Sequence, residues 1–155
     1  MTKEWIFSPS FLLEDPYGER TFPVLPGFFH LTPRWNSGGI WGIRMGPLSN
    51  TFFLAASLGA VAVLISLLRS ATWRRTRMSD AAAGMILGAA AGNLYDRIVH
   101  QAVRDFLDFH WRRYAYPTFN LADSLICVGT VLLAWHLMRS DPGKSRSTSG
   151  SVASR

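Results

Sequence analysis

Three aspartates stand in polar clusters beside long apolar stretches of this chain, and they are its best candidates for acid–base chemistry. Asp96 lies in Gly92-Asn93-Leu94-Tyr95-Asp96-Arg97, and Asp123 lies in Phe119-Asn120-Leu121-Ala122-Asp123-Ser124. Asp105 lies between these clusters, in Val103-Arg104-Asp105-Phe106. Two carboxyl groups held close together cannot both ionise cheaply, so they share a proton. One then acts as a base for water and the other as an acid for a carbonyl oxygen or leaving amine, as in aspartic proteases.

Each of these acids also has an ordinary structural interpretation. Asp123 or Asn120 could cap the N-terminus of a helix. Asp96 could be the ion-pair partner of an arginine, and its spacing of three and four residues from its neighbours places Asn93, Asp96 and Arg97 on one helix face. Asp105 and Asp108 could be solvated loop acids, which is the interpretation we expect for Asp108. The spacing therefore permits a carboxylate pair without specifying one.

Other chemistries find little support. His30, His100, His110 and His136 have no metal-ligand spacing, and the single cysteine, Cys127, excludes a disulfide framework or a multi-cysteine metal site. The chain has no Ser-x-x-Lys, Gly-x-Ser-x-Gly, His-Glu-x-x-His or phosphate-loop pattern, so serine, zinc and nucleotide chemistries are not indicated. We therefore expect neither a metal nor a cofactor.

Three apolar stretches, at about 47–68, 78–98 and 120–138, must position the polar clusters. The first lies within Met45–Leu68, which has no charged residue, and a helix of about 20 apolar residues crosses a bilayer core. The second is rich in alanine and glycine, and the four-residue spacing of Gly84, Gly88 and Gly92 usually marks close helix contact in lipid. The pattern predicts a mainly α, polytopic membrane protein with three transmembrane helices.

Charge gives these stretches an orientation. The net charge of +6 comes from 16 basic and 10 acidic residues, and the basic residues lie between apolar stretches, so nucleic-acid binding is not expected. The arginine-rich turn Arg69–Arg77 and the Ser/Gly-rich tail 139–155 favour the cytoplasm, and the tail is expected to be disordered. Segments 1–46 and 97–119 are then expected on the extracytoplasmic side of the membrane. The first of them favours short extended pieces with turns at Pro26-Gly27 and Ser37-Gly38-Gly39.

Four motifs, in order along residues 22–138, resemble those of the signal peptidase II family, the bacterial lipoprotein signal peptidases. Pro26–Thr32 followed by Trp35–Gly42 resembles the family's first extracytoplasmic segment with its Asn-x-Gly element. Gly92-Asn93-x-x-Asp96-Arg97 resembles its GNxxDR box. Val103–Phe106 and Phe119–Ser124 resemble the two boxes that each carry one catalytic aspartate.

The resemblance implies that Asp105 and Asp123 are the catalytic pair of an aspartyl endopeptidase that needs no cofactor. Its substrate would be a diacylglyceryl-modified prolipoprotein, cut just before the lipidated cysteine. The residues implied to line or support the substrate site are Asn36, Asn93, Asp96, Arg97, Asn120 and Ala122. The implied partners are this precursor and membrane lipids, with no nucleic acid and the chain a monomer. The implied location is the bacterial inner membrane, crossed several times, with the active site on the extracytoplasmic side.

The chain also departs from the family pattern. The family has four spans and starts in the cytoplasm, whereas this chain starts where the family's first span has already ended. We therefore expect a single membrane-embedded domain over 1–138, with no family counterpart for residues 1–20. The first helix is missing either because the start is misassigned or truncated or because the protein lacks it. A non-catalytic membrane homologue or partner-binding subunit is the alternative function. The resemblance leaves open which of Asp105 and Asp123 is the base.

Overall fold

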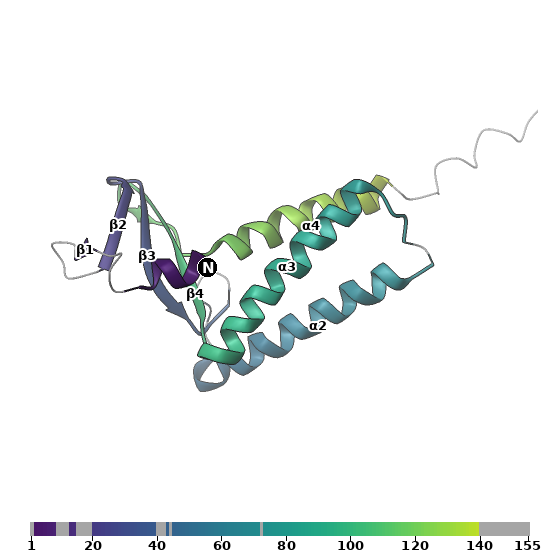
Figure 1. The fold of residues 1–155 in the computed structure, drawn as a ribbon, viewed down its shortest axis with the longest axis horizontal. Helices are drawn as coiled ribbons and strands as arrows, with labels where there is room; N and C mark the ends of the chain where they lie inside the picture. Colours follow the sequence, from purple (N-terminus) through teal and green to yellow (C-terminus); the bar gives the residue numbers. More distant parts are fainter. Residues whose placement is uncertain are drawn as a thin grey trace, which may run out of the picture.

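The structure, a computed structural model, describes residues 2–8, 13–14, 20–39, 43, 45–71 and 73–139. Figure 1 shows three long helices at one end of the molecule and a small sheet at the other. The elements, in chain order, are α1 (Thr2–Ile6), β1 (Leu13–Glu14), β2 (Arg20–Leu25), β3 (Phe29–Asn36), the 3-10 helix η2 (Gly46–Leu48), α2 (Ser49–Arg69), α3 (Arg77–His100), β4 (Val103–Trp111), β5 (Tyr114–Ala115) and α4 (Leu121–Arg139). Of the expected disordered tail, Arg139 ends α4 and the rest lies outside the described residues.

The three long helices cover the three apolar stretches, and two of them are apolar enough to cross a membrane. These are Gly46–Arg69, with a mean hydropathy of 2.3, and Leu121–Arg139, with 1.7. Only 6% and 11% of their most apolar windows are buried within the molecule. Exposed apolar surface on this scale is unfavourable in water and favourable in lipid. A polytopic membrane protein is therefore supported by two of the three expected spans.

The glycine row of α3 does not make the close helix contact that its spacing predicts. A Cβ atom added at Gly84, Gly88 or Gly92 would meet no described atom within 4 Å. Close packing of α3 against α4 occurs instead at Gly129, where an added Cβ would lie 2.9 Å from the carbonyl oxygen of Ala82. The expectation was wrong because the buried face of α3 is the one built from alanines. These are Ala82, Ala83, Ala89 and Ala90.

The sheet is antiparallel, in the order β1-β2-β3-β4-β5. β2 and β3 are joined at the expected Pro26-Gly27 turn, where Gly27 has φ +75°, a conformation that favours glycine. The sheet is not confined to the N-terminal segment, because β4 pairs with β3 along residues Phe29–Asn36. Segment 97–119, expected as a loop, therefore contains the strand β4. The sequence does not indicate this strand because its charged residues, which are buried in the structure, resemble those of an exposed loop.

The polar clusters meet at the junction between the helices and the sheet. α3 turns into β4 through Gln101, whose φ of 57° is left-handed. After β5 the chain returns alongside β4, where the carbonyl oxygen of Phe119 accepts hydrogen bonds from the backbone N–H groups of Phe106 and Leu107. α4 begins two residues later, at Leu121. The end of α3, the start of β4 and the start of α4 are therefore held together.

Candidate active site

Asp105 is a buried carboxylate whose described hydrogen-bond donors are both neutral amides. Its side chain is on β4, and the residue is 2% exposed. Asn120 Nδ2 donates to Oδ1 at 2.7 Å, and Asn36 Nδ2 donates to Oδ2 at 2.9 Å. Burial raises the pKa of Asp105 to about 6; the two amide hydrogen bonds oppose this rise, and the charge of Asp123 adds to it. Asp105 is therefore suited to hold a proton at a pH where an exposed aspartate has lost it.

Asp123, on the first turn of α4, is the more open of the two carboxylates. Its Oδ1 accepts a hydrogen bond from Asn93 Nδ2 at 2.9 Å, and its Oδ2 accepts one from the backbone N–H of Asn120 at 3.0 Å. The residue is half-buried and borders a cavity. Asp123 is therefore oriented by the protein while it remains accessible to a ligand or a water molecule.

Asn120 joins the two carboxylates and caps α4 at the same time. Its Oδ1 accepts hydrogen bonds from the backbone N–H groups of Ala122 and Asp123, at 2.8 and 3.3 Å. Asp123 returns a bond to the Asn120 N–H, which completes a capping box. The Asn120 Nδ2 is then free to bind Asp105. The capping interpretation is thus confirmed for Asn120, and the helix cap itself sets how Asp105 and Asp123 lie relative to each other.

Asp96, in contrast, is surrounded by cations. Its Oδ1 accepts hydrogen bonds from Nη2 and Nε of Arg104, at 2.8 and 3.0 Å, and its Oδ2 lies 2.7 Å from Nζ of Lys3. The interpretation of Asp96 as the ion-pair partner of an arginine is confirmed. The partner is Arg104, which also donates its backbone N–H to Asp96. Asp96 therefore ties the end of α3 to β4 and α1.

Lys3 is a site residue that sequence reasoning missed. Its Nζ donates to Asn93 Oδ1 at 3.1 Å as well as to Asp96. This contact orients the Asn93 amide, whose Nδ2 then faces Asp123. Lys3 is 93 residues away from Asp96 in the sequence, so no motif spacing connects the two. The four motifs that resemble the family do not include Lys3.

Arg97 and Ala122 support the site without touching either carboxylate. Arg97 Nη2 donates to the carbonyl oxygen of Gly38 at 2.8 Å, and its guanidinium lies 5.5 Å from the centre of the Phe53 ring. It therefore anchors the segment that follows β3, next to Asn36. Ala122 is buried and contributes its backbone N–H to the Asn120 cap. Asp96 and Arg97 are buried and Asn93 is half-buried, which fits the shared helix face expected for them.

Asp108 is not a solvated loop acid, so the expectation for it was wrong, and the same alternative for Asp105 does not hold either. Both lie on β4, where Asp108 is 5% exposed and its Oδ1 lies 3.0 Å from Nε2 of His110. His30 is the cross-strand neighbour of Asp108. One donor atom from each of His30, Asp108 and His110 lies within 4.8 Å of the others. The spacing along the chain did not reveal this group, because His30 reaches it across the sheet.

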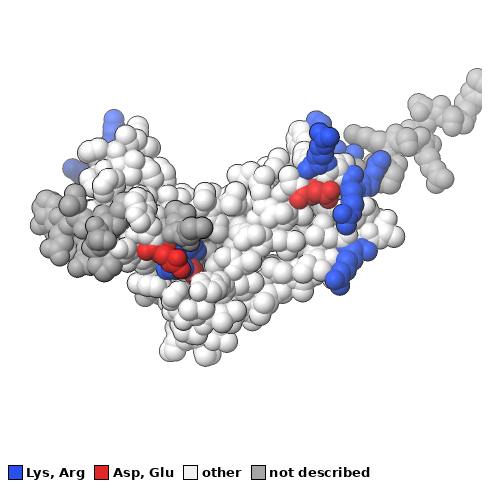
Figure 2. Space-filling model, in the orientation of Figure 1, with Lys and Arg blue, Asp and Glu red and all other residues white. Residues whose placement is uncertain are grey.

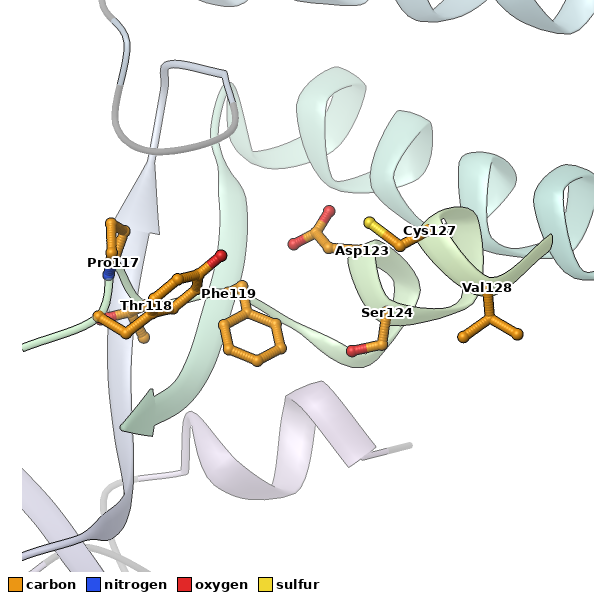
Figure 3. A pocket seen from close by; sticks show the side chains of 8 residues that line it. Pro117, Thr118, Phe119, Asp123, Ser124, Cys127 and Val128 are labelled. Carbon is orange, nitrogen blue, oxygen red and sulfur yellow. The ribbon is translucent and has the colours of Figure 1, made fainter. Parts of the chain in front are cut away.

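A cavity of about 310 Å³ opens beside Asp123. Figure 3 shows Asp123, Ser124, Cys127 and Val128 following one another along α4, with Phe119 on the segment that leads into the helix. The remaining lining residues are Tyr116, Pro117 and Thr118. The walls are largely apolar apart from Asp123, so the cavity can hold an apolar chain with a polar group against the carboxylate.

Comparison with known proteins gives the family of the chain. A family model described as signal peptidase (SPase) II matches residues 1–139. The match includes the first 20 residues, which corrects the expectation that they have no family counterpart. The lipoprotein signal peptidase of Bacillus pumilus (strain SAFR-032) is 37% identical over 130 residues, which are 84% of this chain and 79% of the relative. That of Yersinia pestis (strain Pestoides F) is 37% identical over 134 residues, 85% of this chain and 75% of the relative.

Two solved structures of bacterial membrane enzymes, both determined by the in meso method, have a similar fold. One, at 2.3 Å resolution, has a TM-score of 0.74 and 27% identity and covers 98% of this chain and 85% of its own. The other, at 1.9 Å, has a TM-score of 0.69 and 28% identity and covers 89% and 83%. Both likenesses agree with the membrane character indicated by the apolar helices. On the family match and the identities to its relatives, the chain belongs to the signal peptidase II family.

Proposed function

We propose that this protein is an aspartyl endopeptidase that removes the signal peptide from diacylglyceryl-modified prolipoproteins, cutting just before the lipidated cysteine. The observation that carries the proposal is the joining of Asp105 and Asp123 through Asn120, with Asp105 buried and Asp123 open to a cavity. The substrate class is supported by the relatives, which are lipoprotein signal peptidases.

In the proposed mechanism Asp105 is the acid and Asp123 is the base. Asp105 carries the proton because it is buried among neutral amides, with its pKa raised to about 6. Asp123 removes a proton from a water molecule that attacks the scissile carbonyl carbon, while Asp105 protonates the carbonyl oxygen. The tetrahedral intermediate then collapses, and Asp123 passes its proton to the leaving amine as Asp105 regains its own. Asn36, Asn93 and Asn120 hold both carboxylates in place throughout.

The charge distribution supports a site on the extracytoplasmic side of the bacterial inner membrane. Figure 2 shows basic side chains gathered at the end of the long helices that lies away from the sheet. The surface between that end and the junction with the sheet is nearly uncharged in this view. Arg69, Arg74, Arg75 and Arg77 belong to the α2–α3 connection at that end. Positive residues favour the cytoplasm, so the sheet and both carboxylates are proposed to lie at the opposite interface, within one domain over 1–138.

The substrate is proposed to reach Asp123 from the lipid. Besides Asp123, the cavity is lined by Cys127 and Val128, which lie farther along α4. Few residues of this helix are buried within the molecule. An apolar signal segment or acyl chain can therefore enter from the bilayer without crossing water. Both carboxylates come from one chain, so the proposed active unit is a monomer.

The proposal is tested with the purified full chain in detergent and two synthetic precursor peptides that differ only in the diacylglyceryl group on the cysteine. We expect cleavage of the lipidated peptide, with product masses that place the cut immediately before the modified cysteine. The unmodified peptide should be cut far more slowly. A double variant, Asp105→Asn with Asp123→Asn, prepared in the same way, measures any contaminating protease. A folded wild-type protein that leaves the lipidated peptide intact would instead support the non-catalytic membrane homologue.

A further inference from the structure

A second group of polar side chains lies farther along β4 than Asp105. Asp108 and His110 are two residues apart on this strand and therefore point to the same face. Between Asp105 and Asp108 the regular alternation is interrupted, because the backbone N–H groups of Phe106 and Leu107 both donate to the carbonyl oxygen of Phe119. His30, on β3, pairs directly with Asp108, and the His30 and His110 rings lie 5.1 Å apart. None of the hydrogen bonds and ion pairs described for these three residues involves Asp105 or Asp123, so the group is separate from the proposed catalytic carboxylates.

The buried member of this group is an acid whose described ion pair is with a histidine. Asp108 is 5% exposed, and its Oδ1 lies 3.0 Å from His110 Nε2. A buried carboxylate is costly unless a cation or a set of donors compensates its charge, and a histidine supplies a full charge only when it is protonated. A divalent cation held between the three side chains would compensate the same charge at any pH where the imidazoles are neutral.

We propose that His30, Asp108 and His110 form a binding site for a late divalent transition metal ion, with Zn²⁺ as the reference case. Two imidazoles and one carboxylate are a donor set that suits Zn²⁺, Cu²⁺ and Ni²⁺, whereas Ca²⁺ and Mg²⁺ require mainly oxygen ligands. Three protein ligands leave one position of a tetrahedral site for water. A metal at this place connects β3 to β4 and so stabilises the sheet that carries Asp105.

The geometry needs only side-chain adjustment to close the site. The donor atoms lie within 4.8 Å of one another, and Zn–N distances of about 2.0–2.1 Å require them to approach to about 3.3 Å. Rotation of the imidazoles can supply this, since the His110 side chain is 34% exposed. His30 Nε2 accepts a hydrogen bond from the exposed Gly27 N–H at 3.2 Å. When the metal takes Nε2, water can satisfy that N–H.

Access to the site is also present. His110 lines a cavity of about 380 Å³ together with Pro26, Gly27, Phe28, Trp111 and Arg112. This cavity gives an ion a path from solvent to the His110 imidazole. The charge of Arg112 repels a cation there, so we expect weaker binding than at a closed structural zinc site.

The test is a Zn²⁺ titration of the full chain in detergent, without a polyhistidine tag, in competition with a chromophoric chelator. We expect one Zn²⁺ per chain and a rise in the melting temperature with Zn²⁺. His30→Ala and His110→Ala should each weaken binding by about tenfold or more, as loss of a ligand removes well over 1.4 kcal/mol. His100→Ala, which alters an exposed histidine on α3, should bind as the wild type does.

A footprint on the wild-type protein keeps the proposal falsifiable if a variant fails to fold. The histidines are acylated with diethyl pyrocarbonate with and without Zn²⁺, and modification is mapped by mass spectrometry. Protection of His30 and His110, with His100 unchanged, supports the site. Protection of His100 or His136 in place of His30 and His110 would overturn the proposal. So would a wild-type protein that binds Zn²⁺ no more tightly than His30→Ala and His110→Ala do.

Discussion

β4 buries two kinds of charged group, and these differ in their partners. Asp105 accepts hydrogen bonds from the neutral amides of Asn36 and Asn120. Arg104, in contrast, forms an ion pair with Asp96, and Asp108 lies against His110. A carboxylate beside cations is held in its ionised form, whereas one held by amides in a buried place can keep a proton. The difference separates the acid proposed to react from those that hold the fold.

The difference between reacting and structural acids is tested most strongly at Asp123, the second member of the proposed catalytic pair. Asp123→Asn preserves size and keeps a hydrogen-bonding side chain but removes the base, so the cleavage rate for a lipidated precursor should fall by about 10²–10⁴-fold. Ser124→Ala, at the next residue and in the same cavity, should keep most of the rate. Steady-state cleavage followed by mass spectrometry measures both. Near-normal cleavage by Asp123→Asn would remove Asp123 from the proposed mechanism.

Asp96→Asn should affect stability more than chemistry. Asp96 is fully buried between Arg104 and Lys3, and removing one partner of a buried ion pair costs about 3–5 kcal/mol. The melting temperature in detergent should therefore fall clearly, while the cleavage rate per folded molecule stays close to that of the wild type. If Asp96→Asn kept its melting temperature and lost cleavage, the division between the two kinds of acid would be wrong.

Asn120→Ser separates the capping role of Asn120 from its contact with Asp105. Serine also caps helices, so the melting temperature should change little, but its hydroxyl is too short to replace the donor to Asp105. Losing a hydrogen bond to a charged group costs about 1.5–3 kcal/mol, so cleavage should fall by about 10- to 100-fold. Asn120→Ala, which loses both roles, should in addition be about 1 kcal/mol less stable. A serine variant as active as the wild type would show that this donor is not needed.

The smallest expected effect is on the titration of Asp105 itself. Its pKa is raised to about 6, mainly by burial and partly by the negative charge of Asp123. Asp123→Asn removes that charge, ionisation of Asp105 becomes easier, and its pKa should fall. Carboxyl ¹³C NMR of aspartate-labelled protein measures the shift, with Asp108→Asn as the control that leaves it unchanged. A pKa that rises or stays the same in Asp123→Asn would mean that the two carboxylates do not interact.

The sequence predicted the long helices well and the sheet only in part. Uncharged stretches such as Met45–Leu68 mark α2 directly. The sequence of β4 predicts a loop because Arg104, Asp105 and Asp108 interrupt its apolar residues, and only the fold supplies the partners that allow their burial. The same reason explains the wrong expectation for Asp108, whose histidine neighbours lie on the same strand and on β3.

The candidate site was anticipated where motifs carry it and missed where contacts cross the chain. Asn36, Asn93, Asn120, Asp105 and Asp123 come together as the resemblance implied, although their catalytic roles stay predictions. Lys3 was missed because its contacts with Asn93 and Asp96 depend on where α1 lies against α3 and β4. The packing of the glycine row was mispredicted because spacing alone does not tell which face of a helix is covered.

The most direct test of the account is the cleavage rate of Asp105→Asn measured beside that of Asp108→Asn. Both changes replace a buried carboxylate of β4 by an amide of the same size, at positions three residues apart on the strand. We predict that Asp105→Asn lowers cleavage of a lipidated precursor by about 10²–10⁴-fold, while Asp108→Asn, once folded, keeps most of its rate. Cleavage by Asp105→Asn at the rate of Asp108→Asn, in proteins of equal melting temperature, would contradict the account.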